Sequence, residues 1–159
     1  MKKLFVMTIL LFAALQYNIE SMHFSIKNTN QGNIINITVI EAWEMLQNEE
    51  DGIQYPIDVR TFIEYFNERI TTPHLYDKPI LFPLQLIEKP FFMKLFIAIF
   101  EDKEIILYCR SANRSYIAAK LLIENGYEGT LYNMIGGIKA WKEAGLPTVK
   151  GFGFVSCDT

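Results

Sequence analysis

The chain has 159 residues, half of them hydrophobic, and a formal net charge of -3 at pH 7. This length suits one compact domain, because two domains usually need on the order of 100 residues or more each. The weak negative charge, without a basic stripe, excludes the electrostatic surface that binds a phosphate backbone. We therefore predict a single domain, a monomer, and no nucleic-acid partner.

The first 21 residues have the pattern of a secretory signal peptide. Lys2 and Lys3 precede an apolar run from Leu4 to Leu15, which polar residues follow. This run of 12 residues is shorter than the roughly 20 that a membrane-spanning helix needs. We predict a signal peptide over residues 1–21 and export to the periplasm or the medium. The alternative is an uncleaved leader that tethers the protein to a membrane. Without residues 1–21 the chain keeps 13 of its 15 basic and 17 of its 18 acidic residues, a net charge of about -4.

The remaining chain divides into three parts. Residues 22–34 predict a loose mature N-terminus, residues 35–150 the folded domain, and residues 151–159 a C-terminal tail. The two cysteines, Cys109 in the domain and Cys157 in the tail, are too few for a disulfide framework and lack the spacing of a zinc site. No metal is therefore expected. Cys157 is either a free thiol or a group that reacts with Cys109 in an oxidising compartment.

The first half of the domain predicts short helices and strands in alternation. Thr38 and Glu41 fit a capping box that opens a helix ending near Asn48. Residues 53–59 predict a strand, in which Pro56 favours an edge or a bulge because it lacks an amide donor. A second helix begins near residue 62 and is stopped by residues 71–73, and a short strand follows at 80–84.

The second half continues the alternation. Residues 91–100 are almost all apolar and predict a mostly buried helix; the alternative is a helix that faces a membrane or a partner. Residues 104–108 form a continuous apolar run, which is typical of a strand buried on both faces of a parallel sheet. A helix over 114–125, a strand over 130–134 and a final helix around Trp141 complete the domain.

This order predicts an α/β fold, with a mainly parallel sheet of about five strands flanked by helices on both faces. Active sites in such sheets lie beyond the carboxyl ends of the strands. Two polar stretches fall at such ends: Asp58 to Arg60 after one strand, and the residues from Cys109 onward after another.

The loop after the strand at 104–108 carries the chemistry. Its residues are, in order, Cys109, Arg110, Ser111, Ala112, Asn113, Arg114 and Ser115. Backbone amides at the start of the following helix lack partners within the helix and can converge on an anion. If that anion is the Cys109 thiolate, the thiol pKa falls, and the two arginines lower it further. A merely packed cysteine does not call for so many polar neighbours, whose burial is costly. We predict that Cys109 is a nucleophile.

With these residues the chain resembles the rhodanese, or sulfurtransferase, family over roughly residues 35–150. The matching stretches are the helix 41–46, Asp58-Val59-Arg60 with Glu64-Tyr65, the loop 108–115, and Met134-Ile135-Gly136-Gly137 with Trp141 and Gly145. In this family four residues separate the cysteine from the basic residue that closes the loop, as they do here, whereas related phosphatases and arsenate reductases have five. The resemblance therefore favours a sulfur substrate, and a phosphatase or arsenate reductase is the alternative.

The resemblance implies a rhodanese-like fold and a two-step transfer without a cofactor. Cys109 takes sulfur from thiosulfate or a persulfide donor, holds it as a persulfide among the loop amides, and yields it to a thiol or cyanide acceptor. Arg110 and Arg114 offset the charge of the donor. Asp58 and Arg60 brace the loop; the alternative is a surface ion pair. Ser111 and Ser115 either belong to the site or cap the helix.

Two further features bear on substrate and role. Residues 71–79 depart from the family pattern and lengthen the segment at the rim of the site, so substrate preference does not carry over. A last alternative is a non-catalytic module that binds a partner protein through the apolar segment 91–100 and delivers persulfide sulfur to it.

Overall fold

The computed structural model describes residues 34–48, 52–75 and 78–151. The predicted signal peptide, nearly all of the predicted loose N-terminus, and the tail beyond Gly151 with Cys157 lie outside these residues.

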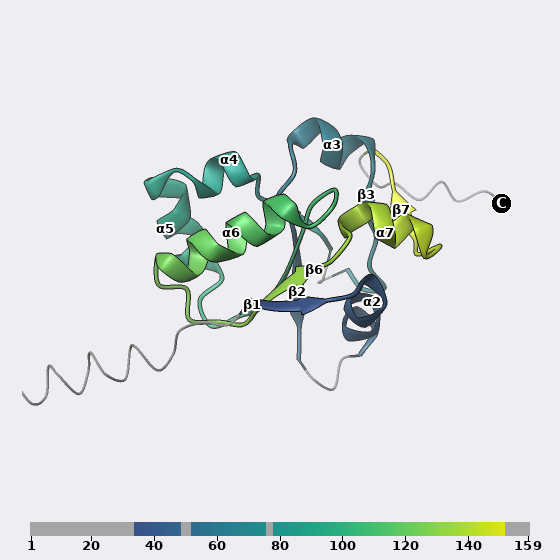
Figure 1. Cartoon of the computed structure of the whole chain (residues 1–159), viewed down its shortest axis with the longest axis horizontal. Coiled ribbons are helices and arrows are strands. Elements are labelled where there is room, and N and C mark those ends of the chain that lie inside the picture. Colours follow the sequence, from purple (N-terminus) through teal and green to yellow (C-terminus); the bar gives the residue numbers. More distant parts are fainter. Residues whose placement is uncertain (1–33, 49–51, 76–77, 152–159) are drawn as a thin grey trace, which may run out of the picture. The chain divides into compact units, whose positions relative to one another are not determined.

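Five parallel strands form the central sheet, in the order β1-β6-β5-β2-β4 (Figure 1). They are β1 (Ile34–Ile37), β2 (Gln54–Asp58), β4 (Ile80–Leu81), β5 (Glu104–Tyr108) and β6 (Leu131–Met134). The central strand β5 is the continuous apolar run, and its side chains from Ile105 to Tyr108 are fully buried. The predicted α/β fold with a parallel sheet is confirmed. Because all five strands run the same way, their carboxyl ends share one edge of the sheet.

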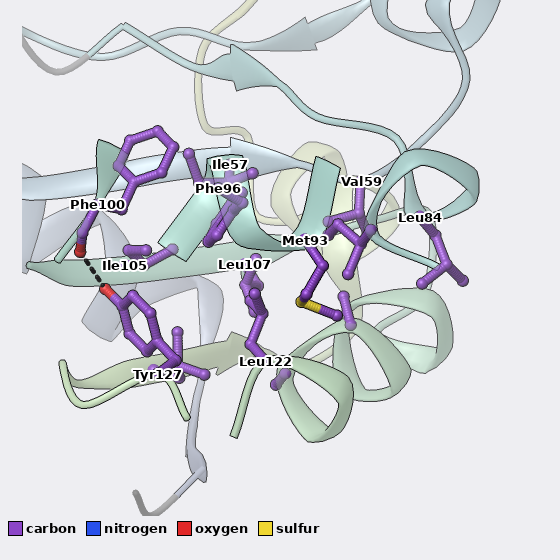
Figure 2. Close-up of a cluster of buried hydrophobic side chains, with 14 of the residues drawn as sticks. Ile57, Val59, Leu84, Met93, Phe96, Phe100, Ile105, Leu107, Leu122 and Tyr127 are labelled. Atoms are coloured by element: carbon purple, nitrogen blue, oxygen red, sulfur yellow. Dashed lines mark hydrogen bonds between the residues drawn. The ribbon is translucent and has the colours of Figure 1, made fainter. Parts of the chain in front are cut away.

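Helices cover both faces of this sheet (Figure 1). Helices α2 (Val39–Gln47) and α7 (Gly137–Glu143) pack on one face, and α4 (Leu84–Ile87), α5 (Pro90–Ile99) and α6 (Asn113–Glu124) on the other. The strand β5 contributes side chains to the hydrophobic cores on both faces of the sheet, because its successive side chains point to opposite faces. Ile105 and Leu107 enter the cluster under α4, α5 and α6, which Figure 2 shows, and Ile106 and Tyr108 enter the cluster under α2 and α7.

The capping box at Thr38 is present. The Glu41 amide donates to the Thr38 hydroxyl at 3.2 Å, and the Glu41 carboxylate accepts from the Thr38 amide at 2.6 Å. Pro56 lies within β2, which pairs along its length with β5 but meets β4 only at Ile57 and Asp58. The strand therefore has a neighbour on one side only at the level of Pro56, as the missing amide donor requires.

Several predicted boundaries were wrong. Ile34, predicted to lie in a loose segment, begins the edge strand β1. The helix α3 (Phe62–Asn67) ends before Arg69, because Arg69 and Ile70 form β3 and pair antiparallel with β7 (Thr148–Val149). The strand predicted at 80–84 stops at Leu81, since Pro83 initiates α4. For β1 and β3 a partner strand overrides the local pattern, which sequence periodicity alone does not reveal, whereas β4 is shortened by its own proline.

The apolar helix α5 is only half buried, contrary to the prediction. Met93 and Phe96 pack into the core, whereas Phe91, Leu95 and Ile99 are 71%, 41% and 56% exposed. These three residues lie four positions apart and so share one side of the helix. None of the helices among the described residues is long and apolar enough to cross a membrane.

Candidate active site

Cys109 lies at the carboxyl end of the central strand β5, and its side chain is almost completely buried, with 1% exposed. The chain turns back through Ala112, which adopts a left-handed conformation with φ of 76° directly before α6 begins at Asn113. A non-glycine residue in this conformation costs roughly 1–2 kcal/mol, so the turn is held by its surroundings. This turn brings the first amides of α6 back toward Cys109.

The loop amides surround the Cys109 sulfur. Burial raises the pKa of this thiol, but the backbone amides of Ser115, Ser111 and Arg114 and the hydroxyl of Ser115 stabilise the thiolate and outweigh it. The net result is a thiol pKa below its usual value. The Ser115 hydroxyl lies 3.7 Å from the sulfur. Neither Ser111 nor Ser115 caps α6 with its side chain, contrary to one of the two alternatives.

The other side of the loop is held by the start of α7. The Ile138 amide donates to the Cys109 carbonyl at 2.9 Å, and the Lys139 amide donates to the Arg110 carbonyl at 3.2 Å. Gly137, with φ of 57°, lies so close that a Cβ atom there would stand 2.3 Å from the Cys109 carbonyl oxygen. The second glycine of Gly136-Gly137 is therefore required by the active loop.

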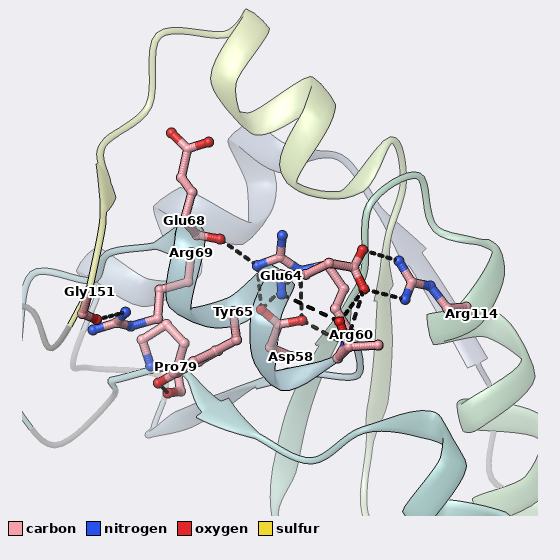
Figure 3. A network of polar contacts seen from close by, with 10 residues as sticks. Asp58, Arg60, Glu64, Tyr65, Glu68, Arg69, Pro79, Arg114 and Gly151 are labelled. Carbon is pink, nitrogen blue, oxygen red and sulfur yellow. Dashed lines mark hydrogen bonds and ion pairs between the residues drawn. The ribbon is translucent and has the colours of Figure 1, made fainter.

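Arg114 pairs with a carboxylate of α3 (Figure 3). Its two terminal nitrogens donate to the two oxygens of Glu64 at 2.8 and 2.7 Å. Glu64 is itself fixed by a second capping box, in which it accepts from the Thr61 amide at 3.1 Å. Since the fork of Arg114 is occupied, its charge is already offset before any donor arrives.

Asp58 and Arg60 form a buried ion pair behind the loop (Figure 3). The Arg60 side chain donates to the Asp58 carboxylate at 2.6, 2.9 and 3.1 Å and also to the Glu68 carbonyl at 2.7 Å. Asp58 is fully buried and Arg60 is 5% exposed. The alternative of a surface ion pair is thus wrong, and the pair links the end of β2 to the end of α3.

A cleft of about 530 Å³ opens beside the loop, between α3 and α7. Arg110 lines it together with Arg60, Lys139 and Lys142, and with acidic residues of both helices. Glu64 pairs with Arg114, Glu68 with Lys142, and Glu143 with Lys139. Within the described part of the chain no ion pair is formed by Arg110, so its guanidinium is the loop charge left for a ligand.

The comparisons with known proteins agree with this architecture. The model of the rhodanese-like domain matches residues 38–144. The chain belongs to the rhodanese-like domain family. It is 36% identical over 94 residues to a sulfurtransferase of Allochromatium vinosum, a match covering 58% of this chain and 76% of that protein.

Two further matches extend the comparison. An uncharacterized protein of Synechocystis sp. is 35% identical over 115 residues, which are 72% of this chain; the chain spans 57% of that relative's length. The crystal structure of a rhodanese-like domain protein from Staphylococcus aureus is 25% identical, with a TM-score of 0.51, and the match covers 68% of this chain and 91% of that one.

Some residues of this rhodanese-like site had no clear signal in the sequence. Glu64 was named only within the matching stretches, although its spacing from Thr61 is the capping-box signal that places a carboxylate at the start of a helix. Asn133 on β6 gave no signal, because its partner Ser115 lies 18 positions away. Among the described residues no group of three or more His, Cys, Asp or Glu side chains is placed to hold a metal ion.

Replacing Glu64 with glutamine is expected to remove part of the acid sensitivity of the domain. The Arg114 guanidinium, with help from Thr61 and against the effect of burial, lowers the pKa of Glu64 from 4.5 to about 2. A carboxyl group with a lowered pKa stabilises the folded state above its ordinary pKa, and this contribution is lost as the pH falls through the lower one. The wild type should therefore lose its advantage over Glu64→Gln between pH 4.5 and about 2.

Urea denaturation at a series of pH values measures this difference in the free energy of unfolding. Arg114→Leu, which removes the other member of the pair, should abolish the same pH dependence. Both side chains are partly exposed, so added salt should reduce the effect. A stability difference that stays constant from neutral pH to pH 2 would contradict the assignment.

Proposed function

We propose that this protein is a rhodanese-type sulfurtransferase in which Cys109 carries the sulfur. The observation that supports this most directly is the convergence of the loop amides of Ser111, Arg114 and Ser115 on the Cys109 thiol, whose pKa is lowered despite burial. The family and the sulfurtransferase from Allochromatium vinosum point to the same chemistry. A thiol whose pKa is lowered by neutral amides forms the attacking thiolate more readily and is also a better leaving group.

The transfer proceeds in two displacements. The Cys109 thiolate attacks the outer sulfur of thiosulfate, a sulfur–sulfur bond forms, and the bond within thiosulfate breaks as sulfite leaves with its electron pair. A cyanide ion or a thiolate then attacks the outer sulfur of the Cys109 persulfide, and the Cys109 thiolate departs with the electron pair of that bond. Division into two displacements makes each of them easier than a single direct transfer.

Arg110 supplies the charge that attracts the donor. It is exposed on the cleft side of the loop, whereas the fork of Arg114 is occupied by Glu64. A guanidinium group matches the oxygens of thiosulfate and of the departing sulfite. Of the two arginines that were expected to offset the donor's charge, we therefore assign the contact to Arg110 and the bracing of the loop to Arg114.

The loop length favours sulfur over phosphate chemistry. Four residues separate Cys109 from Arg114. In the resemblance described above, the phosphatases and arsenate reductases of this fold have one residue more, which makes room for a tetrahedral oxyanion. A hydrolase thus remains the alternative that an experiment has to exclude.

Intact mass spectrometry after incubation with thiosulfate tests the proposal. The wild-type protein should gain the mass of one sulfur atom, and cyanide should remove it with release of thiocyanate. Cys109→Ser should gain nothing, and the matched control Cys157→Ser should load as the wild type does. Loading that is reduced in Cys157→Ser would show that the tail thiol takes part.

Two other outcomes would overturn the proposal. An absence of the adduct, together with Cys109-dependent hydrolysis of a phosphate ester, would identify a hydrolase. An adduct that forms but turns over neither with cyanide nor with small thiols would identify a module that delivers sulfur to a partner protein and would contradict the enzymatic role.

Replacing Arg110 with glutamine is expected to raise KM for thiosulfate about tenfold and to change kcat little, because one charged contact of ~1.4 kcal/mol is lost from donor binding. Lys139→Gln is the matched control. Lys139 lines the same cleft but is paired with Glu143 at 3.8 Å and is highly exposed, so its loss should change KM far less. Steady-state kinetics at low and high salt measure both variants. Equal KM values for the wild type and Arg110→Gln would show that Arg110 does not bind the donor.

A further inference from the structure

A row of hydrogen bonds leads from the exposed edge of the sheet inward to the Cys109 sulfur. Asn36 on β1 lies opposite Asn133 on β6, and the Asn133 amide nitrogen donates to the Asn36 amide oxygen at 2.8 Å. The amide oxygen of Asn133 then accepts from the Ser115 hydroxyl at 2.7 Å. The Ser115 oxygen in turn lies 3.7 Å from the Cys109 sulfur. Asn133 and Ser115 are both buried, at 4% and 0% exposure.

The Ser115 hydroxyl has one proton to donate, and more than one acceptor lies within reach of it. The Asn133 oxygen at 2.7 Å is nearer than the Ala112 carbonyl oxygen at 3.1 Å, and both are nearer than the sulfur. While Ser115 donates to Asn133, its lone pairs are left to face the sulfur, an arrangement that suits a thiol rather than a thiolate. To donate to the thiolate, Ser115 has to release Asn133, whose buried oxygen then loses its partner.

We infer that Asn133 is a positioning residue that competes with Cys109 for the Ser115 proton and so limits how far the loop stabilises the thiolate. In the structure Asn36 accepts from the Asn133 amide nitrogen, which leaves the Asn133 amide oxygen facing Ser115. Asn133 does not touch substrate in this arrangement; it acts through Ser115.

This competition suits a nucleophile that also has to leave. A thiolate that is stabilised too strongly becomes a weaker nucleophile, and the most effective attacking thiol has a pKa near the ambient pH. When an acceptor removes the outer sulfur and the Cys109 thiolate departs, rotation of the Ser115 hydroxyl from Asn133 to the sulfur stabilises it. The inference rests on the geometry around Cys109 and goes beyond the proposed transfer of sulfur.

The charges around Cys109 stay the same when Asn133 is changed to an uncharged residue. The ionisable side chains on the elements packed against the loop include Arg110 and Arg114 in the loop, Tyr108 at the end of β5, Asp58 and Arg60 at the end of β2, Glu64 on α3, Tyr116 on α6, and Lys139, Lys142 and Glu143 on α7. A shift of the thiol pKa in Asn133→Leu therefore reports the hydrogen bonds and not a change of nearby charge.

The pH dependence of alkylation by iodoacetamide tests the inference on the full chain. In a Cys157→Ser background only Cys109 reacts, and the assay needs no sulfur donor, so its result is independent of the proposed function. Asn133→Leu removes the nearest competing acceptor of the Ser115 proton and should lower the midpoint by up to about one pH unit, with up to about a tenfold faster reaction well below it. Asn133→Asp keeps the acceptor and adds a negative charge, so it should raise the midpoint.

Two further variants test whether Asn133 acts through Ser115. In a Ser115→Ala background, Asn133→Leu should leave the midpoint unchanged. Asn36→Ala, an exposed change that leaves the core intact, should lower the midpoint in the same direction as Asn133→Leu but by less, and it carries the test if Asn133→Leu does not fold.

The opposite results would overturn the inference. A midpoint that rises in Asn133→Leu means that the amide donates to Ser115 and supports the thiolate. Equal shifts of Asn133→Leu and Asn133→Asp in the same direction, or a full Asn133→Leu effect in the absence of the Ser115 hydroxyl, mean that Asn133 acts only by packing.

Discussion

Replacing Gly137 with alanine is expected to destabilise the protein by about 3 kcal/mol and to abolish sulfur loading. The left-handed conformation costs an alanine roughly 1–2 kcal/mol, and overpacking adds about 1–3 kcal/mol. The added Cβ would stand 2.3 Å from the Cys109 carbonyl oxygen and 2.6 Å from the Arg110 carbonyl carbon, which are backbone atoms. Relief of this clash has to displace either α7 or the loop that holds Cys109.

Gly145→Ala separates the two contributions. Gly145 has φ of 72°, close to the 57° of Gly137, but nothing lies within 4 Å of the added Cβ. This control should lose only the conformational share, roughly 1–2 kcal/mol, and should load sulfur normally. Urea denaturation and intact mass measure both variants. Equal destabilisation of the two would mean that the contact of α7 with the loop is not tight.

Replacing Arg60 with methionine is expected to cost about 3–5 kcal/mol, the range observed when one partner of a buried ion pair is removed. The change leaves the fully buried Asp58 carboxylate without its partner and removes the donor to the Glu68 carbonyl. The loss should be visible as a lower urea midpoint. It should also reduce the rate of sulfur loading, because Arg60 holds the end of α3, and Glu64, the partner of Arg114, lies in the first turn of the same short helix.

The double variant Asp58→Leu with Arg60→Met is the control. Apolar replacement of both members removes the unpaired charge, so much of the lost stability should return. If Arg60→Met and the double variant are equally unstable, the cost comes from lost packing of the arginine and not from the stranded carboxylate. If Arg60→Met is as stable as the wild type, the pair does not support the fold.

The elements that sequence reasoning located correctly are those whose local signal agrees with their place in the fold. The central strand β5 is buried on both faces of the sheet, and its unbroken apolar run predicts this burial directly. Helix α2 was located from its capping box. Short strands that depend on a partner were harder to predict. The four-residue strand β1 is stabilised by pairing with β6, and the two-residue strand β3 by pairing with β7.

The same distinction applies to the site. Cys109 and its loop were identified because the residues that make the nest of amides are consecutive in sequence. The residues that control this loop come from elsewhere: Glu64 from α3, Gly137 from α7 and Asn133 from β6. Their contacts depend on how the strand ends converge at one edge of the sheet, which no local pattern encodes.

The exposed side of α5 is the clearest difference between the predicted and the observed burial. An almost continuous apolar sequence predicts burial all round, but helix α5 lies at the outside of its layer and turns Phe91, Leu95 and Ile99 outward. The residues of a helix show how apolar it is but not how many other elements surround it, so the exposed side could only be seen in three dimensions.

The small ribbon of β3 and β7 decides where the chain can be shortened. Its antiparallel pairs join Arg69 to Val149 and Ile70 to Thr148, and Gly151 continues the attachment by donating to the Phe66 carbonyl and accepting from the Arg69 side chain. A stop codon after Gly151 preserves every one of these contacts. A stop codon after Pro147 removes them all and uncovers Ile70, which is otherwise fully buried. The useful limit for truncation, crystallisation or fusion at this end is thus set by the two-stranded ribbon of β3 and β7, far along the chain from Cys109.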